Sequence, residues 1–124
     1  MTIFEVISKA DELKFNAFSQ EQKVGWLSRL DHMVKTQIID THEGGENVNF
    51  TGYGSDTDLH TKLLIPDPFD EVYLRWMEAQ IDYHNGEIEK YNISITMFNT
   101  EYEAFANWYN RNYMPVSRGS RFIF

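Results

Sequence analysis

The sequence predicts an all-α protein, a small helical bundle forming a single domain over residues 1–124. Two observations indicate this fold class. Apolar residues recur at steps of three and four over several long segments, which is the period of an amphipathic helix. Residue types that typically cap or terminate helices occur at the ends of these periodic segments. A chain of 124 residues is long enough to bury a core without disulfides, and it contains no cysteine.

The first two helices are expected over residues 3–14 and 20–40. Each is preceded by a capping box, in which the side chains of two residues three apart bond each other's backbone N–H. In the second helix, an apolar stripe continues at helical spacing to its end. The two capping boxes are Thr2 with Glu5 and Ser19 with Gln22.

Residues 41–65 have no helical period and are expected to form a long loop with room for at most one small β-hairpin. The segment contains four glycines and two short β-prone stretches, at residues 48–50 and 62–65. Loops of this length within a compact domain are generally functional or disordered. The candidate interface residues of this loop are Phe50 and Tyr53.

A C-terminal helical hairpin is expected over residues 68–84 and 87–113. Asp67 followed by Pro68 is a start signal, with aspartate as the N-cap and proline at the first helical position. Apolar and aromatic residues then recur in a heptad-like seam through the second helix of the hairpin.

The break between these two helices depends on Asn85 and Gly86. Glycine costs a continuous helix about 1 kcal/mol and suits the left-handed residue that often follows a helix. The seam keeps its phase through this point, so a hinge within one long helix is the alternative. Pro115 ends the second helix. The expected core residues are Trp26, Leu27, Leu30, Val34, Trp76, Ile81, Tyr91, Ile95, Phe98, Tyr102 and Phe105.

Composition argues against several classes of function. The net charge of −8 is a poor match for a protein that coats DNA through basic side chains. No apolar run approaches the ~20 residues of a membrane span, and no signal peptide is expected. The absence of cysteine excludes thiol catalysis and thiolate zinc sites.

Charge is unevenly distributed along the chain. Residues 67–103 carry two basic and nine acidic side chains, whereas residues 104–124 carry three arginines and no acidic side chain. The extended tail, residues 115–124, is therefore either a solubilised end or an arm that docks on an acidic surface, such as that of an identical neighbour. The candidate interface residues at this end are Arg111, Arg118, Arg121, Phe122 and Phe124.

No motif indicates a catalytic, cofactor or metal site. Residues 42–46 (HEGGE) lack the second histidine that a helical zinc motif requires. Asp56, Asp58 and His60 alternate as at the start of a calcium loop, but the glycine and the distal glutamate of such a loop are missing. Turn chemistry is the simpler interpretation. We expect no enzyme, and a metal-dependent enzyme built on these three residues is the minor alternative.

Several stretches of the chain together resemble a known family. They are residues 10–19 (ADELKFNAFS), 39–44 (IDTHEG), 64–70 (LIPDPFD), 79–87 (AQIDYHNGE), 97–99 (MFN) and 105–111 (FANWYNR), with Tyr102, Met114 and Pro115. They are similar to small proteins from the structural modules of tailed phages and prophages of Gram-positive bacteria, the head–tail connector (adaptor, or head-completion) proteins.

The resemblance implies a mostly α-helical protein without catalytic residues or cofactors. It implies a cyclic homo-oligomer of about twelve subunits that binds the portal protein and the tail or head-closure proteins. Packaged double-stranded DNA would pass through the ring, and no membrane is involved. The implied location is the host cytoplasm during assembly and then the virion neck. The alternative is another helical phage or prophage interaction module (a regulator, a scaffold or a tail-assembly chaperone) that forms no ring.

Overall fold

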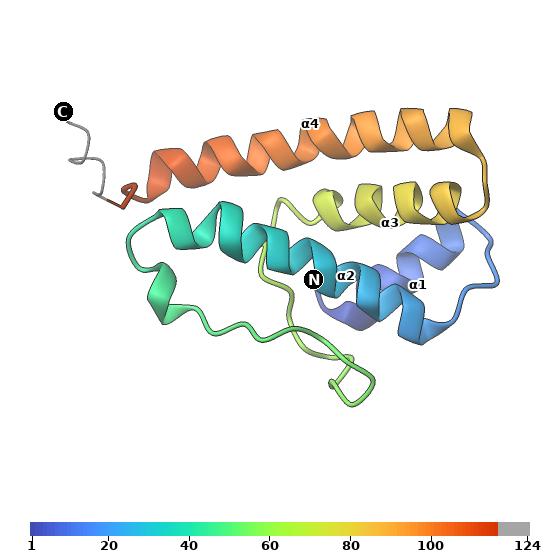
Figure 1. Cartoon of the computed structure of the whole chain (residues 1–124), viewed down its shortest axis with the longest axis horizontal. Coiled ribbons are helices and arrows are strands. Elements are labelled where there is room, and N and C mark those ends of the chain that lie inside the picture. The colour runs from blue at the N-terminus through green and yellow to red at the C-terminus, as the bar shows by residue number, and fades with distance from the viewer. Residues whose placement is uncertain (117–124) are drawn as a thin grey trace.

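The computed structural model describes residues 1–116, which form four α-helices with a long loop between the second and third. The helices are α1 (Ile3–Leu13), α2 (Gln20–Gln37), α3 (Glu71–His84) and α4 (Ile88–Asn112), and two 3-10 turns, η1 (Ile39–Thr41) and η2 (Gly45–Asn47), open the loop. α3 and α4 lie side by side, α4 forms one edge of the molecule, and α1 and α2 lie on the other side of α3 (Figure 1). The all-α fold with its C-terminal hairpin is confirmed.

Both predicted capping boxes form. At α1, Thr2 Oγ1 accepts from the Glu5 N–H (3.2 Å) and Glu5 Oε1 accepts from the Thr2 N–H (2.9 Å). At α2, Ser19 Oγ accepts from the Gln22 N–H (3.1 Å), and the glutamine side chain accepts from the Ser19 N–H (3.1 Å). α2 ends at Gln37, short of residue 40, because the chain tightens there into η1.

The predicted start of the third helix is wrong, because α3 begins at Glu71 and not at residue 68. The residues before it form a turn, in which the Phe69 N–H bonds the carbonyl of Pro66 at 3.0 Å. Asp67 is not the N-cap, and its carboxylate instead lies 3.7 Å from the amine of Met1. The Asp–Pro pair thus belongs to the turn that leads into the helix.

The break between α3 and α4 is confirmed. Gly86 has a φ of +75°, in the left-handed region that glycine adopts without strain. The Asn85 N–H still bonds the Ile81 carbonyl at 3.0 Å, as the last turn of α3 requires. The two helices are therefore separate, and a hinge within one continuous helix is excluded.

Residues 41–65 form the predicted long loop, but the β-hairpin does not form. Residues 1–116 contain no β-strand. The stretch at residues 62–65 does not pair with residues 48–50, because its backbone is hydrogen-bonded to the start of the chain instead. The Leu63 N–H bonds the Met1 carbonyl at 3.0 Å. Two isolated antiparallel bridges are present, Thr2 with Lys62 and His42 with Pro115.

Most of the predicted core is buried. The buried members are Trp26, Leu27, Leu30, Val34, Trp76, Ile81, Phe98 and Phe105. Tyr91, Ile95 and Tyr102 are only half-buried, because α4 lies at the edge of the molecule and packs on one side. Tyr73 of α3 is fully buried, and the apolar face of α1 adds Ile3, Val6, Ile7 and Ala10.

Candidate subunit interface

A buried carboxylate fixes the long loop to the helices. Asp31 of α2 has no exposed surface, and its two oxygens accept three hydrogen bonds. Oδ1 accepts from the Tyr73 hydroxyl of α3 at 2.7 Å. Oδ2 accepts from the Tyr53 hydroxyl at 2.5 Å and from the Leu64 N–H at 3.1 Å. Asp31 therefore ties two separate parts of the loop to the bundle, and the loop is an ordered surface.

Burial and the nearby carboxylate keep the two tyrosine hydroxyls of this network protonated. Burial raises the pKa of Asp31, because the desolvation of the carboxylate outweighs the hydrogen bonds that favour its charged form. Burial also raises the pKa of Tyr53 and of Tyr73, and the neighbouring charge of Asp31 adds to both shifts. Both hydroxyls therefore remain donors at physiological pH. The arrangement is suited to holding the loop in place.

The structure places both predicted interface residues of the loop against α2. Phe50 is half-buried, with its ring centroid 4.7 Å from that of His32 and 5.0 Å from that of Tyr53. The Tyr53 N–H bonds Ser28 Oγ at 3.0 Å, and its hydroxyl is held by Asp31. Both aromatic side chains thus stabilise the loop from within the chain, and only their exposed parts are open to a partner.

The exposed side chains of the loop are acidic. Residues 42–61, called the acidic loop below, contain four acidic side chains and no lysine or arginine. All four are exposed, and none forms an ion pair within residues 1–116. The loop therefore presents negative charge on an ordered backbone. The four residues are Glu43, Glu46, Asp56 and Asp58.

Asp56, Asp58 and His60 take part in turns. The His60 N–H bonds Asp58 Oδ1 at 2.9 Å, and the Gly54 N–H bonds Thr57 Oγ1 at 2.8 Å. In the part of the chain that the structure describes, no group of three metal-ligating side chains comes together.

The C-terminal end of α4 is anchored beside the start of the acidic loop. His42 is buried, and its Nε2 lies 2.7 Å from Asn110 Oδ1. The Glu43 N–H bonds the Met114 carbonyl at 2.8 Å, and the Val116 N–H bonds the last carbonyl of η1 at 2.9 Å. The backbone is therefore held by hydrogen bonds as far as Val116.

Residues 111–124, called the basic end below, contain three arginines and no acidic side chain. Arg111 is exposed and forms no ion pair within the described residues. Exposed apolar side chains follow it: Tyr113 (43%), Met114 (68%) and Val116 (37%). The other predicted interface residues, Arg118, Arg121, Phe122 and Phe124, lie outside the described residues.

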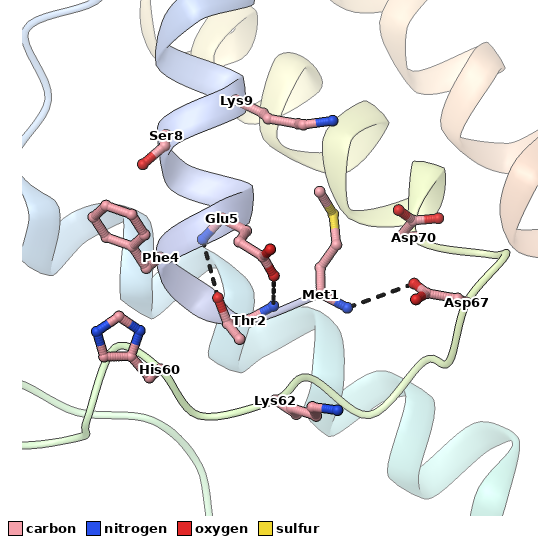
Figure 2. A pocket seen from close by; sticks show the side chains of 10 residues that line it. All are labelled: Met1, Thr2, Phe4, Glu5, Ser8, Lys9, His60, Lys62, Asp67 and Asp70. Carbon is pink, nitrogen blue, oxygen red and sulfur yellow. Dashed lines mark hydrogen bonds and ion pairs between the residues drawn. The ribbon is translucent and has the colours of Figure 1, made fainter.

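A surface hollow of about 830 Å³ lies where the start of α1 meets the loop (Figure 2). The Thr2–Glu5 capping box and the ion pair between Met1 and Asp67 occupy its centre. The rest of the wall carries two lysines and one acidic residue beside uncharged side chains: Lys9, Lys62 and Asp70, with Phe4, Ser8 and His60. Because charges of both signs line it and several are already paired, the hollow favours no single class of ligand.

The sequence analysis did not identify two features of the structure, the buried residue that holds the loop and the exposed apolar side of α4. The first is Asp31, whose only signal was its position within the apolar stripe of α2, between Leu30 and Val34. The second is the side of α4 that faces away from the bundle, where Ile93 is 64% and Met97 40% exposed.

Comparisons of the chain with protein families, curated proteins and solved structures gave no match. None of the helices within residues 1–116 has both the length and the apolar composition that crossing a membrane requires.

Proposed function

We propose that the protein is a structural subunit of a phage or prophage head–tail connector. It assembles into a ring between the portal protein and the tail or head-closure proteins, extends the DNA channel and aids head completion. The role is mechanical and non-enzymatic, and it is performed in the virion neck. The observation that carries the proposal is the presence of two oppositely charged segments on one chain, the acidic loop and the basic end.

A ring is built from heterologous contacts, in which one surface of a subunit meets a different surface of its neighbour. The acidic loop carries four negative side chains and the basic end three positive ones. Hydrogen bonds hold the loop to α2, so it provides a preformed docking surface. Exposed ion pairs are weak and screened by salt, so we expect assembly to weaken as ionic strength rises.

The overall charge also suits a DNA channel. With a net charge of −8, the subunit repels the phosphate backbone on average. Such a wall lets DNA slide past, whereas a basic wall would bind it.

Reversal of charge at the basic end tests the proposal. We expect the purified chain to form a closed oligomer, measured by light scattering after size exclusion, which is lost in an Arg118→Glu/Arg121→Glu variant. The matched control, Arg118→Lys/Arg121→Lys, should retain the oligomer. Adding Asp56→Lys and Asp58→Lys to the reversed variant should restore assembly. Equal assembly of the glutamate and lysine variants would count against this contact.

A second candidate function is that of a helical interaction module that forms no ring. Phe15 is 96% exposed in the turn between α1 and α2, and Leu13 beside it is 57% exposed. This turn lies at the opposite end of the long axis from the end of α4 (Figure 1). Exposed apolar side chains of this size suit a partner protein. A Phe15→Ser variant that loses a phage partner while the wild-type chain remains monomeric would favour this function.

A further inference from the structure

We infer that the side of α4 facing away from the bundle docks on the α4 of a second copy of this chain, with the two helices antiparallel about a two-fold axis at Thr100. The contact is isologous, whereas the contact of the proposed ring is heterologous. Arg111 is the one residue that belongs both to this face and to the basic end, and the inference does not rest on the ring.

The proposed docking surface, called the outer face of α4 below, is a continuous row of residues. Its members follow one another at steps of four and three, so that at 3.6 residues per turn they line one side of the helix. Phe98 and Phe105, which are buried against α3 and the loop, lie on roughly the opposite side. Every member of the row is exposed. The members are Glu89, Ile93, Met97, Thr100, Ala104, Asn107 and Arg111.

The chemistry of the row is unusual for a solvated helix face. Such faces normally carry charged side chains, but the five members between the two ends carry none. The Thr100 hydroxyl bonds the Thr96 carbonyl within the helix at 3.2 Å, so its burial leaves no donor without a partner. Because α4 lies at the edge of the molecule, no other described helix covers this side (Figure 1).

The two charges at the ends of the row identify the occupant. Glu89 stands in the first turn of α4 and Arg111 in the last. They are 22 residues apart, which is roughly 33 Å along a helix, so they cannot pair within one chain. In an antiparallel pair with Thr100 opposite Thr100, each Glu89 lies beside the Arg111 of the other copy. A parallel pair would place like charges together, so complementarity selects the antiparallel arrangement.

The same register also matches side-chain size. Met97 of one copy lies opposite the region of Ala104 in the other, so a long side chain meets a short one. Glu103, on the flank of the row, lies opposite the uncharged Thr96. The contact is confined to one helix face, so we expect a concentration-dependent equilibrium between monomer and dimer.

Because the chain contains no cysteine, single introduced thiols report the contact directly. Under mild oxidation, Thr100→Cys should form a disulfide-linked dimer at least about tenfold faster than Thr36→Cys, an exposed control position on α2. Glu89→Cys and Arg111→Cys should cross-link with each other when mixed, and much less when each is alone. All variants are prepared with Arg118→Glu and Arg121→Glu, which remove the proposed ring contact, so the two proposals fail separately.

Charge exchange provides the second measurement. Glu89→Arg and Arg111→Glu should each raise the dissociation constant of the dimer by at least about threefold, which at 25 °C is about 0.7 kcal/mol. The combined variant, with both charges exchanged, should restore the dimer. The two positions are too far apart along one helix to pair within a single chain, so restoration would report contact between two copies. Circular dichroism and urea midpoints establish that each variant is folded. Equal cross-linking at Thr100 and Thr36, no mixed Glu89–Arg111 product, or no restoration by the combined variant would each overturn the antiparallel contact.

Discussion

Removal of one hydroxyl group from the buried network should destabilise the whole fold. The Tyr73 hydroxyl donates to Asp31 Oδ1 and accepts from the Ile65 N–H, both at 2.7 Å, and the residue has no exposed surface. Tyr73→Phe therefore leaves a buried carboxylate oxygen and a buried N–H without their partner. A hydrogen bond to a charged group contributes about 1.5–3 kcal/mol, and an unsatisfied buried group costs about 1–3 kcal/mol. After partial relaxation we expect a loss of about 3 kcal/mol.

Tyr53→Phe is the matched control, because it removes the other tyrosine hydroxyl bound to the same carboxylate. Tyr53 is only half-buried, and Asp31 Oδ2 keeps the Leu64 N–H at 3.1 Å after the change. The expected loss is about 1 kcal/mol. Both variants should remain folded, since a domain of this length has roughly 6–18 kcal/mol of stability.

Urea unfolding at pH 7, followed by circular dichroism, measures both losses. The unfolding free energy should fall with urea concentration at a similar slope in both variants, while the midpoints differ. A change in midpoint at constant slope is a change in stability. A loss for Tyr73→Phe that is below about 1 kcal/mol, or smaller than that for Tyr53→Phe, would refute the role assigned to the buried network.

Three further changes test other parts of the structure. Phe98→Ala should cost about 3–5 kcal/mol in urea unfolding, because the ring is 4% exposed and lies 5.1 Å from that of Trp76; a loss under about 1 kcal/mol would contradict its burial. Gly25→Ala should raise stability by about 0.5–1 kcal/mol, because the position is exposed in α2 with no atom within 4 Å of an added Cβ, and destabilisation would show that the site is not open. The raised pKa of Asp31 means that the folded chain holds this proton to higher pH than the unfolded chain, so the wild type should lose stability relative to Asp31→Asn as the pH rises from about 4 towards 7. The opposite trend in unfolding free energies would mean that the hydrogen bonds outweigh burial.

The helices were predictable where the signal is local. Capping boxes and the three-to-four spacing of apolar residues act within one or two turns, and α1 and α2 begin where these signals stand. Gly86 identified the break between α3 and α4, because its left-handed backbone is a local requirement. The predicted start of α3 was wrong because residues 66–69 form a turn before the helix, in which the Phe69 N–H bonds the Pro66 carbonyl at 3.0 Å.

The loop was the least predictable part of the fold. Its β-prone stretches favoured pairing with each other, but the Leu63 N–H bonds Met1 and the Leu64 N–H bonds Asp31. Both partners lie more than 30 residues away, and no pattern within the loop identifies them. Tyr53 is a predicted interface residue of this loop, but its hydroxyl is held within the chain by Asp31. Arg111 is exposed, as an interface residue needs to be.

Assembly of the chain with and without its tail tests the proposed function most directly. Truncation after Val116 removes residues 117–124 but keeps the backbone bonds that anchor the end of α4. Mass should be measured by light scattering after size exclusion, across protein concentration, for both chains alone and mixed with the portal protein of the same phage or prophage. The account predicts a large closed oligomer for the full chain, alone or on the portal, which truncation abolishes. Monomers in every sample, or rings that form equally well without residues 117–124, would contradict it.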